Sequence, residues 1–266
     1  MMRKNRIVPV VIFLIGMALP QHSNAWGLLG HRIVGQIADS YLTKKARKSI
    51  TAILGNESVA MCSNWADFIK SDSSYNYLDT WHYVNFVSGL SKEGVYAYLH
   101  NDSLVNAYSK GQWLIGQLKD RSLPLPTQQM YLRLLIHIIG DIHQPLHAGR
   151  LSDRGGNGIK VQWFRENKNL HQVWDEMLIN YQQLSYTEYA AVINHATPEE
   201  RKMLQQSPME EWIWESYQHA EDIYAFIKTP DQRLSWDYNF KYKAIMEHQL
   251  LKGGIRLAAV LNEIYK

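Results

Sequence analysis

The chain has 266 residues, enough for one sizeable domain or two small ones, and 46% of them are hydrophobic. It has 28 Lys and Arg against 25 Asp and Glu, and three of the cations lie within the first six residues, so the rest of the chain is about neutral. Bulk charge therefore gives no argument for nucleic-acid affinity, and an anionic substrate must be held by local groups. The single cysteine, Cys62, excludes an intrachain disulfide.

The first 25 residues read as a secretory signal peptide. Basic residues precede an apolar run over 7–19, and Ser23-Asn24-Ala25 supplies the small residues of a cleavage site. The apolar run is short and is interrupted by a proline and a glycine, which disfavours a membrane span. We therefore expect residues 1–25 to be removed from an exported protein, periplasmic or extracellular, with no membrane anchor and one domain over 26–266. The lack of disulfides fits a bacterial periplasm or secretion into the medium.

Helical periodicity dominates the first half of that domain. Apolar residues recur every three to four positions over 30–54 and again over 103–119. Thr127 is a candidate N-cap for a further helix, and Pro145 must end that helix near residues 142–144.

The second half continues the pattern. Residues 209–228 and 240–265 are amphipathic at the helical period. Residues 159–165, which follow a glycine-rich loop, look extended, and we expect a short hairpin there. The sequence therefore predicts an all-α fold in a single compact domain.

Histidines paired with carboxylates point to metal chemistry. His137 and Asp141 lie four residues apart, as do His171 and Asp175, so each pair occupies one helix face. His147 lies between the two pairs. Imidazole nitrogen and carboxylate oxygen are the ligands that zinc accepts where no thiolate is present. One such pair is more often a solvated or hydrogen-bonded pair, but two pairs with a histidine between them favour a metal site.

More potential ligands lie upstream. Asp67 and His82 each stand close to a tryptophan in the sequence. Cleavage after residue 25 exposes the α-amino group of Trp26, which could chelate a metal together with its own carbonyl oxygen, and His31 could reach the same ion. The structural alternatives are a helix cap for Asp67, a core position for His82 and the first core residue for Trp26. The other histidines of the domain are not part of such a pattern of potential ligands, and we expect them to be structural: His100, His143, His195, His219 and His248.

Six motifs occur in a fixed order along the chain: Trp26-Gly27…Gly30-His31, Trp65-Ala66-Asp67, Trp81-His82-Tyr83, His137…Gly140-Asp141…Gln144-Pro145-Leu146-His147, Gly155-Gly156-Asn157 and His171…Trp174-Asp175. This combination resembles the zinc-dependent single-strand nucleases of the S1/P1 type, whose relatives include plant bifunctional nucleases and bacterial zinc phospholipases C. The resemblance covers essentially all of residues 26–266. It implies a mainly helical fold with a trinuclear zinc cluster at the bottom of a cleft.

The resemblance implies three Zn²⁺ per chain. The first ion is held by Asp67, His82, His137 and Asp141, the second by His147, His171 and Asp175, and the third by the Trp26 amine and carbonyl, His31 and the other oxygen of Asp141. Three divalent ions and three aspartates leave a local charge of about +3, which supplies the field for phosphate that the neutral chain lacks.

The resemblance further implies cleavage of single-stranded DNA and RNA to 5′-phosphorylated products, and removal of the 3′-phosphate from 3′-nucleotides. Water activated between the first and third ions and oriented by Asp67 attacks phosphorus. Lys70 stands where the fungal pattern has an arginine and lacks the bidentate fork. Tyr83 replaces a base-stacking phenylalanine, Asn85 replaces a base-reading aspartate, and Asn157 is a third substrate contact. No stable protein partner is implied.

Two alternatives remain open at this point. A zinc phospholipase C uses the same metal cage, although Tyr83, Asn85 and the glycine-rich loop before residue 158 favour the nuclease. A non-catalytic metal-binding protein of the cell envelope predicts at least one broken ligand position, and all eight ligand side chains are intact.

Overall fold

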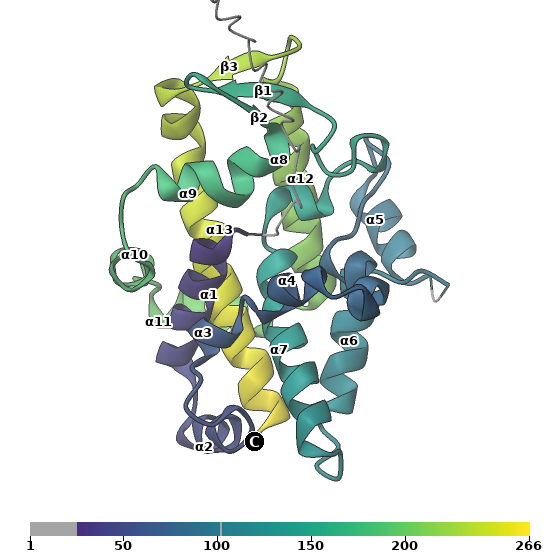
Figure 1. Ribbon diagram of the computed structural model, residues 1–266, viewed down its shortest axis with the longest axis vertical. Coiled ribbons are helices and arrows are strands. Elements are labelled where there is room, and N and C mark those ends of the chain that lie inside the picture. Colours follow the sequence, from purple (N-terminus) through teal and green to yellow (C-terminus); the bar gives the residue numbers. More distant parts are fainter. Residues whose placement is uncertain (1–25, 102) are drawn as a thin grey trace, which may run out of the picture.

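The computed structural model of the protein describes residues 26–101 and 103–266, so the signal peptide expected over 1–25 lies outside the described residues. Helices run mainly along the long axis of the molecule, and a small sheet lies at one end (Figure 1). The all-α expectation is confirmed. Among the described helices, none combines the length and apolar composition that crossing a bilayer requires.

Helices α1 (Leu28–Tyr41) and α13 (Trp236–Ile264) form the centre of the fold. They pack at close range because α13 carries glycine at the contact: a Cβ on Gly254 would lie 2.5 Å from Cβ of Ile37. Helices α7 (Leu125–Asp141) and α12 (Met209–Phe226) pack around this pair. The expectations for 209–228 and 240–265 are confirmed, with α13 beginning four residues earlier.

The helix expected over 30–54 is two helices, so that prediction is wrong in one respect. Leu42 is extended, and the Thr43 hydroxyl accepts a hydrogen bond from the Ala46 N–H, which starts α2 (Lys44–Leu54) as a separate helix. The threonine thus offers the backbone a capping partner that competes with a continuous helix.

Two other helix starts differ from the expectation. Helix α6 (Ala107–Gln117) begins later than residue 103 because Asn106 and Ser109 form a reciprocal capping box. Helix α7 begins before Thr127, which is therefore not its N-cap. Pro126 lies in its first turn, where its missing N–H costs no intrahelical bond. The end of α7 at Asp141 agrees with the break expected before Pro145.

The hairpin expected over 159–165 is present but reaches further. Strand β1 (Lys160–Trp163) pairs antiparallel with β2 (Glu166–Asn169), with Lys160 opposite Asn169. Strand β3 (Gln232–Leu234) adds to β1 in parallel and was not predicted, because a three-residue strand has no periodicity of its own.

Shorter elements connect these parts. The remaining helical segments are α3 (Val59–Cys62), α4 (Trp65–Phe68), η1 (Ile69–Ser71), η2 (Ser73–His82), α5 (Lys92–Leu99), η3 (Pro145–Ala148), η4 (Leu151–Asp153), α8 (Leu170–Gln172), the π-helical η5 (Val173–Met177), α9 (Leu178–Asn180), α10 (Tyr186–Ile193) and α11 (Pro198–Gln206).

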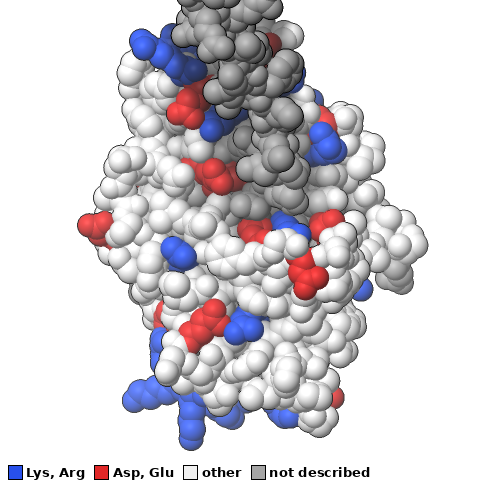
Figure 2. All heavy atoms as spheres, in the orientation of Figure 1, with Lys and Arg blue, Asp and Glu red and all other residues white. Residues whose placement is uncertain are grey.

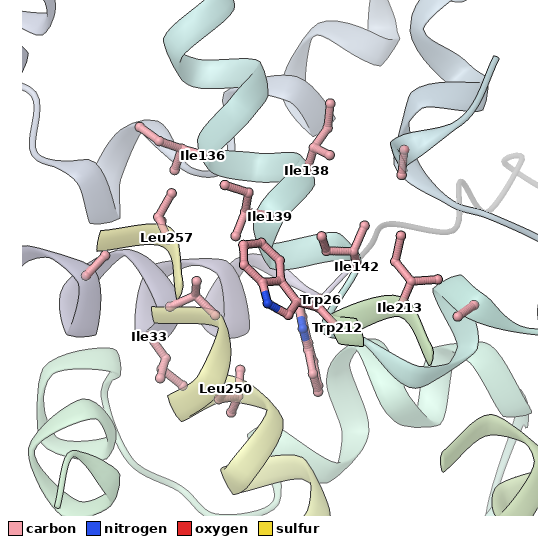
Figure 3. Packing of buried hydrophobic residues seen from close by; sticks show 14 of the residues in the cluster. Trp26, Ile33, Ile136, Ile138, Ile139, Ile142, Trp212, Ile213, Leu250 and Leu257 are labelled. Atoms are coloured by element: carbon pink, nitrogen blue, oxygen red, sulfur yellow. The ribbon is translucent and has the colours of Figure 1, made fainter. Parts of the chain in front are cut away.

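Trp26, the first described residue, is fully buried in the hydrophobic core (Figure 3). It lies in one apolar cluster with residues of α7 such as Ile139 and residues of α12 such as Trp212. The Gly27 N–H donates to the carbonyl oxygen of Asp175 at 2.7 Å. The core thus fixes the start of the domain beside one of the expected metal ligands.

Candidate metal centre

All eight side chains expected to bind metal converge in one buried cluster. Each is at most 7% exposed. They come from seven elements: His31 from α1, Asp67 from α4, His82 from η2, His137 and Asp141 from α7, His147 from η3, His171 from α8 and Asp175 from η5.

One part of the cluster is built around the end of α7. His82 Nδ1 lies 3.0 Å from His137 Nε2 and 3.0 Å from Asp141 Oδ2, and His137 Nε2 lies 3.1 Å from the same oxygen. Asp67 Oδ1 lies 3.7 Å from His137 Nε2. These are the four side chains expected around the first ion.

A second part joins the other histidine–aspartate pair to His147. His171 Nε2 lies 3.2 Å from Asp175 Oδ2, and His147 Nε2 lies 3.9 Å from Asp175 Oδ1. The three side chains form a group whose ligand atoms are close enough to share one ion. Asp175 lies in a π-helical turn, a local widening that is frequently found at functional sites.

His31 joins the cluster from α1. Its Nε2 lies 3.3 Å from Asp141 Oδ1, and its ring stacks on that of His137 at 3.9 Å between centroids. Asp141 therefore presents one oxygen to His31 and the other to His82 and His137. Gly140 makes this approach possible, because a Cβ there would lie 2.7 Å from His31 Nδ1.

Backbone carbonyls orient three of the imidazoles. His137 Nδ1 lies 2.7 Å from the Ser63 carbonyl oxygen, His147 Nδ1 lies 2.6 Å from that of His82, and His171 Nδ1 lies 2.5 Å from that of Gly155. A ring that donates from Nδ1 presents the lone pair of Nε2 to the cluster, which is the usual arrangement of metal-bound histidine.

Gln144 adds an outer partner on the carboxylate side. Its amide nitrogen donates to Asp175 Oδ1 at 2.7 Å. The sequence reasoning assigned no role to Gln144 or to the carbonyls. Gln144 stands inside the motif that ends at His147 and could have been singled out, whereas main-chain carbonyls carry no signal in a sequence.

Several buried polar atoms of the cluster have no hydrogen-bond partner and are available to bind a metal. Both ring nitrogens of His31, Nε2 of His147 and one carboxylate oxygen each of Asp67, Asp141 and Asp175 have no hydrogen-bond partner. Buried polar atoms are rarely left unpaired, and each one costs free energy unless a ligand satisfies it. Nitrogen and carboxylate oxygen donors without thiolate match zinc.

The ionisation of the cluster is consistent with that reading. Burial lowers the pKa of His31 to about 4 and that of His171 to about 3, so both rings are neutral at pH 7, the form that binds metal. Burial opposes ionisation of Asp141, but the neighbouring His137 and His147 hold its pKa well below the ordinary value. Burial raises the pKa of Asp175 well above its usual range, and the nearby carboxylates of Asp67 and Asp141 act in the same direction.

Of the residues expected to contact phosphate and base, Lys70, Tyr83 and Asn85 lie at or beside the cluster. Lys70 Nζ lies 2.7 Å from Asp67 Oδ1. The N–H groups of Val84 and Phe86 donate to the carbonyls of His147 and Gly149, which sets Tyr83 and Asn85 alongside the cluster. Tyr83 is 37% exposed, and Asn85 Oδ1 is buried with no partner.

The hydrogen bonds of the Asn157 side chain are to residues outside the cluster. Its amide donates to the Arg154 carbonyl at 2.9 Å, and its oxygen accepts from Asn169 at 3.5 Å. Its part in substrate binding therefore stays a prediction without support from these contacts.

The histidines expected to be structural that have recorded polar contacts lie outside the cluster. His143 is buried between the Ile139 carbonyl and Arg256. His100 and His248 pair with Glu210 and Glu200 near the surface.

Comparison with known proteins shows which family model and which relatives the chain matches. The family model described as S1/P1 nuclease matches residues 26–266. The chain is 32% identical to Endonuclease 4 of Arabidopsis thaliana over 90% of this chain and 89% of that protein. It is 27% identical to Nuclease S1 of Aspergillus oryzae, over 93% and 94% of the two chains. It is also 27% identical to Nuclease P1 of Penicillium citrinum, over 90% and 98%.

Proposed function

The chain belongs to the S1/P1 nuclease family and is a hydrolase of phosphodiester bonds in nucleic acids, and we propose from that premise that it is an exported, zinc-dependent, single-strand-specific endonuclease. It leaves 5′-phosphorylated products and also removes the 3′-phosphate from 3′-nucleotides. The observation that carries the proposal is the buried cluster of eight side chains, whose unpaired nitrogen and oxygen atoms face one another.

The residues fit three zinc ions. Asp67, His82, His137 and Asp141 would hold one, His147, His171 and Asp175 a second, and His31 with the second oxygen of Asp141 a third. The Trp26 amine and carbonyl would complete the third site after removal of residues 1–25. Bound zinc supplies a strong local positive charge, lowers the pKa of water to near neutrality and stabilises the departing oxygen.

The need for metal charge follows from the surface as well. Acidic and basic side chains are interspersed on the face drawn in Figure 2, and basic groups gather at the end that carries α2. At the cluster itself, a phosphodiester would meet the ions and Lys70, which contacts Asp67. Asp67 accepts from Lys70, so the ammonium group is held beside the reacting phosphate and stabilises its developing charge.

The preference for single strands follows from access. The scissile phosphate must approach side chains that are nearly buried, while the neighbouring base stacks on the exposed ring of Tyr83 and meets the free oxygen of Asn85. A duplex has to lose pairing and stacking energy to adopt that geometry, and an unpaired strand does not.

The proposal is tested with protein that begins at Trp26. We expect zinc-dependent cleavage of single-stranded DNA with 5′-phosphate ends, slower cleavage of duplex DNA, and phosphate release from 3′-AMP. Hydrolysis of lecithin without cleavage of DNA would contradict the proposal and indicate a phospholipase C. Inactivity on all of these substrates with three bound zinc ions would contradict it as well.

A further inference from the structure

A groove lined by aromatic rings is built from elements that also carry candidate metal ligands, and it has no part in the function described so far. It has a volume of about 670 Å³ and runs between η2, α6 and α7. Six rings follow one another along it, each within 6.5 Å of the next: Trp65, Tyr75, Tyr77, Trp81, Trp113 and Tyr131. Tyr77 is 57% and Trp113 is 38% exposed, so part of each side chain is open to a ligand.

Two cations lie over these rings. Lys110 Nζ lies 4.9 Å from the ring centre of Trp81 and 5.3 Å from that of Trp113. Arg133 lies 5.6 Å from the ring of Trp65, but it also pairs with Glu57. Lys110 forms no ion pair within the described residues 26–101 and 103–266, so its charge is free for an anionic ligand.

The groove is continuous with the metal centre through the chain. Trp65 begins α4, the helix that carries Asp67, and Trp81 directly precedes His82. Arg133 lies one helical turn before His137 on the same face of α7. The groove and the candidate metal ligands therefore share α4, η2 and α7, and this shared framework is the link on which the proposal relies.

We propose that this groove binds the single-stranded DNA or RNA that flanks the scissile phosphate. Bases stack on the open faces of rings such as Trp113 and Tyr77, and Lys110 neutralises a backbone phosphate. Aromatic platforms with interleaved cations are how proteins hold unpaired strands without reading their sequence. The inference rests on the proposed nuclease function and extends it: the enzyme prefers longer single strands to dinucleotides.

The experiment compares kcat/KM of the zinc-loaded enzyme for a dodecathymidylate and for the dinucleotide d(TpT). We expect the wild type to prefer the 12-mer and Trp113→Ala to lower that preference about tenfold, the effect of losing one stacked base. The ratio of the two values is independent of the fraction of folded enzyme, so partial unfolding of the variant does not imitate the result. Phe240→Ala, which removes an exposed ring elsewhere, is the matched control.

Lys110→Ala tests the electrostatic part. The slope of log(kcat/KM) for the 12-mer against log salt concentration becomes shallower by about 0.7, the contribution of one phosphate contact in a single strand. Lys119→Ala, an exposed lysine just beyond α6, leaves the slope unchanged.

The outcomes separate the two proposals. Two results overturn the groove proposal and leave the nuclease function intact. One is cleavage of both substrates by the wild type with equal kcat/KM. The other is an unchanged preference in Trp113→Ala together with an unchanged salt slope in Lys110→Ala. No cleavage of either substrate by the wild type overturns the nuclease function, and the groove proposal with it.

Discussion

Substitution of Gly140 by alanine tests the geometry of the metal centre at one atom. The new Cβ would lie 2.7 Å from His31 Nδ1, and relief to an ordinary contact requires a shift of about 0.7 Å. The ring cannot turn aside, because it is 1% exposed and stacks on His137 at 3.9 Å between centroids. Metal–ligand distances tolerate about 0.2 Å. The required shift is therefore several times larger than the site accepts.

We expect Gly140→Ala to lose the ion held by His31, with metal affinity at that site reduced about 10- to 100-fold. Alanine in a helix otherwise gains roughly 0.5–1 kcal/mol over glycine, whereas overpacking costs about 1–3 kcal/mol, so the net effect on stability is small or unfavourable. Gly116→Ala is the matched control in α6, because nothing lies within 4 Å of its Cβ.

The assay is zinc content per chain after equilibration in buffers of fixed free zinc, followed by the rate on single-stranded DNA. Gly116→Ala should behave as wild type in both measurements and unfold at a slightly higher temperature. A Gly140→Ala protein with wild-type zinc content at every free zinc concentration would refute the reasoning, since the His31 ring would then have room that the structure denies it.

Three further predictions follow from the same centre and its surroundings. Protein that keeps residues 1–25, or carries an N-terminal tag, loses one zinc ion and most activity, and full activity in uncleaved protein would show that the Trp26 amine is not a ligand. Lys70→Ala lowers kcat about 10²- to 10³-fold, as loss of one transition-state donor does, while Lys70→Arg retains much of the rate; equal kcat in all three proteins would exclude Lys70 from phosphate binding. Burial and the nearby Arg256 lower the pKa of His143 to about 3. Below about pH 6.5 the unfolded chain therefore takes up a proton on this histidine that the folded chain does not, and the free energy of unfolding decreases as the pH is lowered. His143→Gln should remove about 2 kcal/mol of the fall in unfolding free energy between pH 7 and pH 5, and an unchanged fall in urea unfolding would contradict this.

The sequence predicted that the eight candidate ligand side chains lie together, and the structure places them in one buried cluster. This was predictable because residue type and spacing along the chain can be read from the sequence. Pairs such as His137 and Asp141 share a helix face whatever surrounds them. The groups that orient the histidine rings could not be predicted from the sequence. The carbonyls of Ser63 and Gly155 are main-chain groups, and only the tertiary fold brings them to His137 and His171.

The errors in the fold have local causes. Periodicity continues across Leu42, but the capping hydroxyl of Thr43 divides the helix there. Pro126 is favourable in the first turn of a helix, so α7 begins before Thr127, the residue predicted as its N-cap. Strand β3 is the exception: it depends on pairing with the distant strand β1, in which Val161 lies opposite Gln232, and no local pattern marks it.

The central claim is a buried three-zinc centre that cleaves single strands at the bond between phosphorus and the 3′-oxygen. The most direct test takes protein beginning at Trp26, counts its zinc ions and determines which side of each cut in single-stranded DNA carries the phosphate. The account predicts three ions per chain, 5′-phosphate ends and loss of cleavage on chelation. Cleavage that leaves 3′-phosphates or persists without metal would contradict it, and fewer than three ions in the active protein would show that the ligand assignment is wrong.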